Sequence, residues 1–176
     1  PANRQFLLSE IVSLATVDVL NRYATGFSIK WPNDIYWHDK KIAGILIENV
    51  LSGSTFSRAI IGMGLNINQK NFYSDAPNPV SLHQITGHTY KIEKILDEFT
   101  EALGKRYTDT FTNSSDRIHK EYIAALYRND GVYPFYSDGN IFHASIADVE
   151  LDGHLLLLTE SGEKKRFAFK EVSFLL

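Results

Sequence analysis

The sequence has no cysteine in its 176 residues. This absence excludes thiol catalysis, thiolate metal sites and disulfide bonds, and it fits a reducing compartment. The sequence also lacks an apolar run near the roughly 20 residues that a membrane-spanning helix needs, and its N-terminus lacks the layout of a signal peptide. We therefore expect a cytoplasmic protein with no membrane partner.

An excess of positive charge is absent as well. The formal net charge is -3, which argues against nucleic acid as a partner of this segment. A hydrophobic content of 44% with 12% aromatic residues is enough for a packed core. The chain begins with Pro1 instead of methionine, so we expect it to be part of a longer protein.

The most informative stretch is residues 28–68, which reads as strands joined by tight turns. Connections this short make neighbouring strands antiparallel. We predict strands at residues 27–31, 35–38, 41–51 and 56–68.

The last of these strands has two unlike faces. Alternation places Ala59, Ile61, Met63, Leu65 and Ile67 on one face and Ile60, Gly62, Gly64, Asn66 and Asn68 on the other. The first face is typical of a core wall. The second is nearly bare, which leaves the backbone open to a ligand or to a helix packed across the glycines, or marks a bulge.

A lysine precedes the neighbouring strand. Lys41 stands directly before the apolar run Ile42–Ile47, which contains Gly44. Most lysines are solvated, and we expect this of Lys40. Lys41, beside a glycine floor, is better placed to meet a carboxylate or phosphate.

The segment Lys30–Asp34 joins two strands. Proline fixes a backbone angle, and Asn33 and Asp34 can bond the backbone of a turn. A turn does not need a tryptophan, a lysine and two polar side chains together, so the segment is also a candidate for ligand contact.

Three motifs, KWPNDIY, KKIAGILIE and GMGLNIN, occur in this order. Their order and spacing resemble the three central motifs of biotin protein ligase, which attaches biotin to the carrier domain of biotin-dependent carboxylases. The resemblance implies an α+β fold with a mixed, mostly antiparallel sheet flanked by helices. It also implies two steps: biotin's carboxylate attacks the α-phosphate of ATP, and a carrier lysine then takes the acyl group.

The resemblance also assigns roles to residues. Lys41 matches the catalytic lysine, which would bridge the biotin carboxylate and the α-phosphate. The positions carried over as substrate-binding are Lys30 for a phosphate, Asn33 and Asp34 for orienting the site, Ala43, Gly44 and Ile45 beside biotin, Gly62 and Gly64 as the floor, and Asn66 near the nucleotide.

The implied partners follow from the same reaction. Biotin and ATP would be substrates, Mg²⁺ is expected with them, the biotin carboxyl carrier protein of acetyl-CoA carboxylase would be the acceptor, and a homodimer is possible. We predict no resident metal site, because His38 has no second ligand at suitable spacing. The alternatives are a lipoate or octanoate ligase or transferase, and a non-catalytic biotin-responsive module such as a repressor core.

The chain departs from this family at its front. The family's arginine-rich biotin loop, and the Ser/Thr-bearing strand before it, precede the first helix and have no counterpart in these residues. We therefore expect the chain alone to be inactive. Family members can also carry an N-terminal DNA-binding domain, on which the sequence is silent.

The remaining segments show regular patterns. We predict a helix at residues 5–24 with Gly26 at its C′ position, a lid-like loop at 69–79, a helix capped by Ser81 and ending near Gly87, and helices at 92–111 and 116–127. Strands are expected at 132–136, 141–151, 155–159, 164–169 and 172–175. These strands would form a small SH3-like β-barrel, which gives two domains, 1–129 and 130–176.

Overall fold

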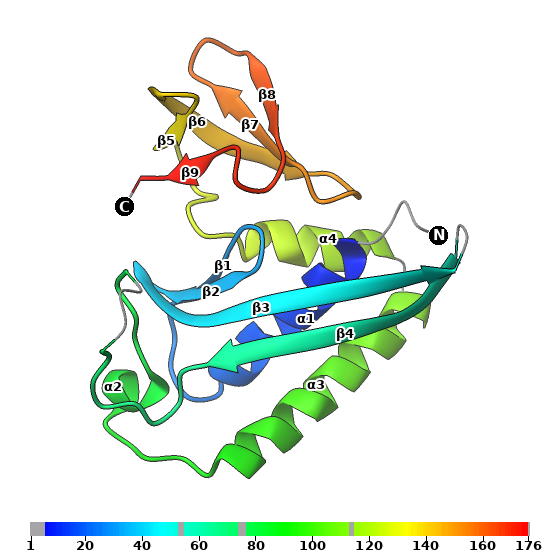
Figure 1. Cartoon of the computed structure of the whole chain (residues 1–176), viewed down its shortest axis with the longest axis vertical. Helices are drawn as coiled ribbons and strands as arrows, with labels where there is room; N and C mark the ends of the chain where they lie inside the picture. The colour runs from blue at the N-terminus through cyan, green and yellow to red at the C-terminus, as the bar shows by residue number, and fades with distance from the viewer. Residues whose placement is uncertain (1–5, 53–54, 74–76, 113–114, 176) are drawn as a thin grey trace.

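The computed structural model describes residues 6–52, 55–73, 77–112 and 115–175. In this part of the chain two antiparallel sheets are accompanied by helices (Figure 1). The predicted α+β class, with antiparallel strands flanked by helices, is confirmed. No helix among these residues is both long and apolar enough to cross a membrane.

The first sheet has the order β1-β2-β3-β4, and each pair of neighbours is antiparallel. The predicted strands are present, with ends shifted by about one residue, but the predicted end of the fourth was wrong: β4 ends at Leu65, so Asn66, Ile67 and Asn68 lie beyond it. Their bounds are β1 Phe27–Lys30, β2 Asp34–Trp37, β3 Lys40–Ser52 and β4 Thr55–Leu65.

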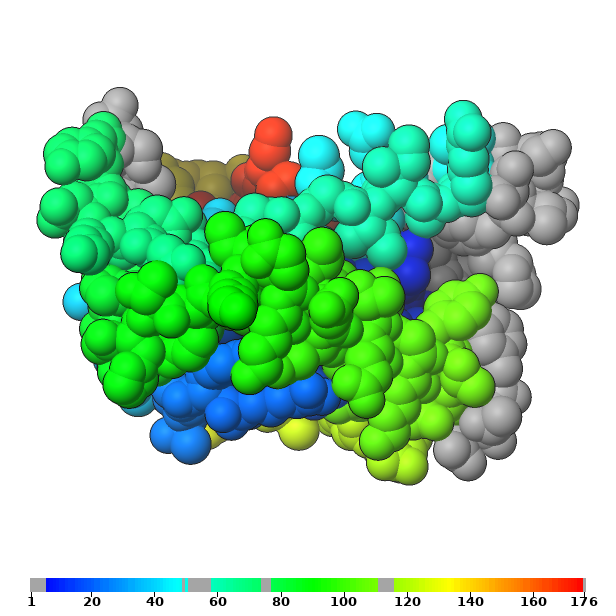
Figure 2. All heavy atoms as spheres, turned by 90° about the horizontal axis from the view of Figure 1, so that it is seen from below, coloured from blue at the N-terminus to red at the C-terminus, as the bar shows by residue number. Residues whose placement is uncertain are grey.

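Helices cover one face of this sheet. They are α1 (Phe6–Leu20), α3 (Ile92–Thr112) and α4 (Ser115–Ala124). In Figure 1, α1 lies behind β3 and β4, and α3 runs below β4. Figure 2 shows the same layers from below, with residues of β4 along the upper edge and those of α2 and α3 beneath. Because α1 is enclosed between the sheet and the other helices, residues on most of its sides are buried.

The predicted end of the first helix was wrong. The helix ends at Leu20, and Gly26 lies in the turn before β1 with φ +95°. A Cβ at Gly26 would come 2.9 Å from the His38 ring. The positive φ and this close approach explain the glycine, which is not a helix cap.

Charged side chains join the helices. Asp18 of α1 accepts two hydrogen bonds from the Arg106 guanidinium of α3, at 2.7 and 2.8 Å, and Arg106 also binds Glu121 of α4. Arg22 follows Asp18 by four residues but has another partner. Its Nη1 lies 3.8 Å from Glu98 Oε2 of α3.

The short helix α2 (Leu82–Thr86) is confirmed with its cap. The Ser81 hydroxyl accepts from the Gln84 backbone, the Gln84 side chain accepts from the Ser81 backbone, and Gly87 ends the helix with φ +76°. The described residues before it, 69–73 and 77–79, form no regular element apart from a bridge between Pro79 and Lys41.

The second sheet has the order β8-β7-β6-β5-β9 and is antiparallel. Its hairpin turns use positive-φ residues, among them Asp138, Gly139, Gly153 and Gly162. Among the described residues its edge strands β8 and β9 are unpaired with each other, so the sheet is open and barrel closure is not shown. The bounds are β5 Tyr133–Ser137, β6 Asn140–Val149, β7 Leu155–Thr159, β8 Lys164–Phe167 and β9 Ser173–Phe174.

The two sheets meet beside α1 and α4. The Trp31 indole N–H, in the β1–β2 turn, donates to the Gly153 carbonyl in the β6–β7 turn at 2.9 Å. The Phe6 ring meets the Tyr122 ring edge-on at 5.6 Å between centroids. A Cβ at Gly153 would come 2.6 Å from Phe6, so this turn requires glycine.

Candidate functional site

A β-bulge decides which face of β3 carries Lys41. Asp34 pairs with Gly44 and Ile35 with Ala43, but Tyr36 pairs with Lys41, so Ile42 is the extra residue. Ile42 and Ala43 are consecutive and both buried, at 0% and 2% exposure. Regular alternation would have separated Lys41 from Gly44. The bulge brings both to the face of the sheet opposite the helices.

Lys41 and Asp34 form an ion pair directly above Gly44. Lys41 Nζ lies 2.7 Å from Asp34 Oδ1, and the two side chains are 37% and 24% exposed. A Cβ at Gly44 would lie 3.4 Å from Asp34 Oδ1 and from Lys41 Nζ and Cε. Because Gly44 has no side chain, the Lys41–Asp34 pair has room directly above it. The Lys41 ammonium remains exposed to solvent on one side.

Glycines continue this face across the neighbouring strand. Gly44 pairs with Gly64, and Leu46 pairs with Gly62. A Cβ at Gly64 would meet no atom within 4 Å, and one at Gly62 only the Leu46 carbonyl at 3.8 Å. In the described part of the chain no helix covers these glycines, so packing does not explain them. Together they form a bare floor beside the Lys41–Asp34 pair.

The other predicted site residues of β3 lie on the inner face of the sheet. The side chains of Ala43 and Ile45 are 2% and 3% exposed and face the helices. Only their backbone groups, and the part of Ile45 that lines the cleft described below, remain for a ligand. The sequence pattern did not distinguish these two positions from Gly44.

The two predicted asparagines hold loops in place. Asn33 Nδ2 donates to the Ile45 carbonyl at 2.6 Å, and the Asn33 carbonyl accepts from the Ile45 N–H at 2.8 Å. Asn66 Nδ2 donates to the Val80 carbonyl at 3.1 Å. Asn33 thus extends the pairing of β3 beyond the end of β2, which fixes the turn before Asp34.

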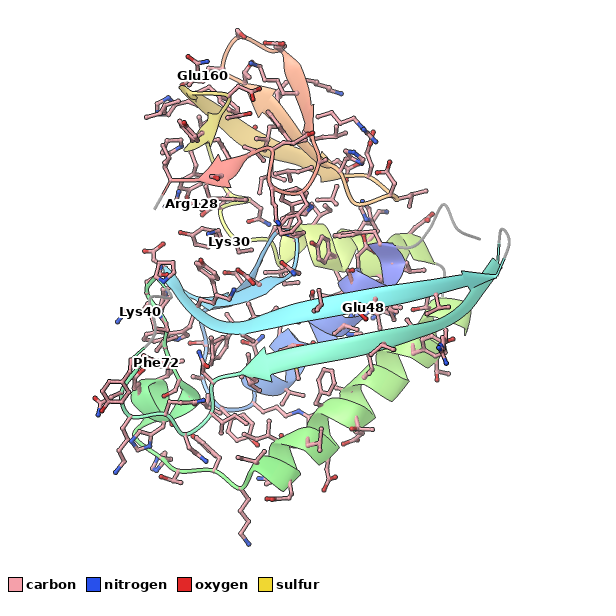
Figure 3. The ribbon with its side chains drawn as sticks, viewed as in Figure 1. Lys30, Lys40, Glu48, Phe72, Arg128 and Glu160 are labelled. Atoms are coloured by element: carbon pink, nitrogen blue, oxygen red, sulfur yellow. The ribbon has the colours of Figure 1, made fainter. Side chains whose placement is uncertain are left out.

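Lys30 lies at the junction between the sheets, where Figure 3 also shows Arg128. Its Nζ donates to the Tyr36 hydroxyl at 3.0 Å and lies 5.6 Å from the Phe174 ring centroid, in β9. Burial lowers the pKa of the Lys30 ammonium, and nearby Lys41 and Arg128 act in the same direction while Asp34 opposes them. Lys30 and Lys41 therefore belong to one electrostatic environment that favours an added anion.

A cleft of about 290 Å³ opens where the pairing of β3 with β2 ends. Of the predicted residues, Asn33 and Ile45 line it, whereas Lys41, Gly62 and Gly64 do not. Ser13 Oγ is buried at its wall without a hydrogen-bond partner. The sequence pattern missed this cleft, because its walls come from distant segments: Phe6, Ser9, Ser13, Trp31–Asn33, Ile45–Ile47, Asp152–His154, Ala168 and Phe169.

One group of potential metal ligands was also missed. The ligand atoms of Glu150, Asp152 and His154 lie within 4.8 Å of one another. Arg166 donates to Glu150 at 2.5 Å and to Asp152 at 2.7 Å, so a guanidinium already balances these carboxylates. The expectation of no resident metal stays a prediction.

Comparison with known proteins finds a family that resembles part of the chain. Residues 2–66 match the family described as the biotin/lipoate A/B protein ligase family. This segment holds Lys41, Asp34 and the glycine floor. Over this segment the chain resembles that family.

Particular relatives extend this resemblance. The chain is similar to the bifunctional ligase/repressor BirA of Bacillus subtilis, at 30% identity over 80% of this chain and 44% of that protein. It is equally similar to the biotin--[acetyl-CoA-carboxylase] ligase of Paracoccus denitrificans, over 69% of this chain and 53% of that protein. The chain thus spans about half the length of these curated relatives.

Solved structures share the fold. A biotin protein ligase from Aquifex aeolicus, in complex with biotin and ATP, superposes with a TM-score of 0.75 at 22% identity, covering 97% of this chain and 71% of that one. Identity this low establishes the fold only.

Proposed function

We propose that this chain is the central and C-terminal part of an ATP-dependent biotin protein ligase. The observation that carries the proposal is the Lys41–Asp34 pair, held over Gly44 beside the uncovered Gly62 and Gly64 floor. It lies within the segment that matches the ligase family. The named relatives and the shared fold support biotin as the acyl substrate.

The chemistry of the site suits the first step. Joining the carboxylate of biotin to the α-phosphate of ATP brings two anions together, and a positioned cation lowers the barrier most where water is scarce. Lys41 would stand between the two anions, with Asp34 setting its orientation. Lys30 would contact the remaining phosphates, and the flat glycine floor would let the apolar part of biotin approach the backbone.

The other proposed contacts act mainly through the backbone. Ala43, Gly44 and Ile45 would offer main-chain groups to biotin, with Ile45 adding apolar surface in the cleft. Asn33 would hold the turn that carries Asp34, and Asn66 would lie beside the nucleotide.

Mg²⁺ would enter with ATP. The described residues around Lys41 offer it a single carboxylate, Asp34, which is already paired with the lysine. This donor set does not fit a protein-held metal, so the proposal assigns no step to one.

For the second step, we propose a lysine of a biotin carboxyl carrier protein as the acceptor, in the cytoplasm where ATP and such carriers occur. A homodimer stays a prediction. We further propose that residues 1–129 belong to the catalytic domain and residues 130–176 form a small SH3-like domain. The bulge of β6 between Ile146 and Asp148 supports a curved sheet.

The test compares acyl substrates in the natural protein that contains this chain. ATP-dependent pyrophosphate release should require biotin, and a carrier protein should then become biotinylated. The family also includes lipoate ligases, and release that depends on lipoate or octanoate instead would replace the proposal with that alternative. Tight biotin binding without release would indicate a non-catalytic biotin-responsive module.

A further inference from the structure

Three charged side chains from three elements meet where the two sheets join. His119 of α4 lies between two carboxylates: its Nδ1 is 2.7 Å from Glu10 Oε1 of α1, and its Nε2 is 2.9 Å from Asp148 Oδ1 of β6. Glu10 is 3% exposed, although it carries a carboxylate. None of these residues belongs to the candidate site.

With both carboxylates ionised, the geometry demands a proton on each ring nitrogen of His119. A neutral imidazole donates from one ring nitrogen only, whereas the imidazolium donates from both. Both nitrogens of His119 face carboxylate oxygens, and an ionised carboxylate can only accept. Only protonated His119 therefore satisfies both ionised partners, and loss of its proton would leave a ring lone pair facing a carboxylate.

The surroundings of His119 favour the protonated form. Burial alone would lower the pKa of the His119 imidazole, but the hydrogen bonds and charges of Glu10 and Asp148 outweigh it and raise the pKa. Burial also raises the pKa of Glu10, with His119 opposing. From α4 itself, Tyr122 faces Glu10, and burial holds the pKa of its phenol well above the usual range.

The second sheet adds further acidic groups. Glu150 and Asp152 line the surface hollow next to His119, and Arg166 binds both of them. Because the folded pKa of His119 is raised, its contribution to stability is complete below about pH 6.5. That contribution is lost as the pH rises through the folded value.

A series of contacts joins this cluster to the candidate site. Asp148 lies near the end of β6, and the turn that follows contains Gly153, whose carbonyl accepts from the Trp31 indole at 2.9 Å. Trp31 begins the turn in which Asn33 binds Ile45 and which leads to Asp34. The position of the β6–β7 turn therefore affects the position of the segment that holds Asp34.

We propose that Glu10, His119 and Asp148 form a pH-sensitive clasp that holds the second sheet against α1 and α4 and keeps the β6–β7 turn on Trp31. Proton loss from His119 opens the clasp. The proposal does not depend on which reaction the site performs, because neither the three residues of the clasp nor Trp31 is among the proposed substrate-binding residues.

The test follows the chain by NMR from about pH 5.5 to about 9.5, a range that brackets the ordinary histidine pKa. The His119 Cε1–H signal should titrate above pH ~6.5. Over the same interval, hydrogen exchange of the Trp31 indole N–H and the β6–β7 amides, corrected for intrinsic rates, should accelerate about tenfold or more, the expected effect of losing a buried charged hydrogen bond. If His119 titrates but hydrogen exchange does not accelerate over the same pH interval, the proposal is overturned.

Two variants separate a switch from a fixed structural contact. In His119→Gln, the Trp31 indole and the β6–β7 amides should exchange hydrogen quickly at every pH, with no pH-dependent acceleration. His143 is exposed on β6, so His143→Gln should behave as wild type. If His119→Gln does not fold, Asp148→Asn, half-exposed at 50%, keeps the shape but removes a charge, so the midpoint should move to lower pH. An unchanged midpoint in Asp148→Asn would contradict the clasp.

Discussion

The two faces of the β3–β4 ladder differ although the same two strands build both. On the inner face, Ile42, Ala43 and Ile45 are at most 3% exposed and pack toward the helices. On the outer face, Leu46 is 61% exposed and Ile60 55%. They stand beside Gly62 and Gly64, where an added Cβ would meet at most the Leu46 carbonyl at 3.8 Å. A fold needs the first arrangement. A fold does not need exposed apolar side chains around uncovered glycines, so the outer face points to a ligand.

The largest effect is expected from Lys41→Ala, which removes the positive charge of the ion pair above Gly44. Biotin-dependent pyrophosphate release by the natural protein should fall at least about a hundredfold, the usual cost of losing a positioned electrostatic group. The melting temperature should change little, since the ion pair is partly exposed. Lys40→Ala, at the exposed neighbouring position, is the control, and equal rates in both variants would refute the role of Lys41.

Ile42→Ala should weaken the packing of the inner face. Ile42 is fully buried, so its truncation should lower the free energy of unfolding by about 2–5 kcal/mol in urea denaturation. Leu46→Ala on the outer face should change it by less than about 0.5 kcal/mol. Similar losses in the two variants would show that both faces are packed, contrary to this account.

A smaller effect is expected from Gly44→Ala, since the new methyl group would lie 3.4 Å from Asp34 Oδ1 and Lys41 Nζ. Displacing the pair slightly should slow pyrophosphate release about tenfold, or about 1.4 kcal/mol. Stability should hold or rise by up to about 1 kcal/mol, because alanine loses less backbone entropy. Gly104→Ala on α3 is the control, because a Cβ there would meet no atom within 4 Å. It should raise stability without slowing release.

Local patterns were enough to predict much of the fold and the floor. Alternation separated Met63 from Gly62 and Gly64, and the structure confirms this division. The capping box at Ser81 and Gln84 depends on residues three apart, so it was also predictable. These features need only neighbouring residues, whose preferences the sequence displays directly.

The bulge and the long-range contacts were not predicted. The apolar pair Ile42-Ala43 was a signal for the bulge, but the same pair also suits a strand buried on both faces. The Trp31–Gly153 hydrogen bond and the Glu10–His119 contact join residues more than 100 positions apart. Such contacts depend on how the second sheet docks, which no local pattern specifies.

The most direct test of the central claim, that the bare outer face is the ligand floor, is calorimetric titration of biotin into the natural protein and its Gly64→Val variant. A Cβ at Gly64 meets nothing within 4 Å, so the variant should fold with a similar melting temperature. The account predicts that the isopropyl group occupies the floor and that biotin binding is lost. Unchanged biotin affinity in a folded Gly64→Val protein would contradict it.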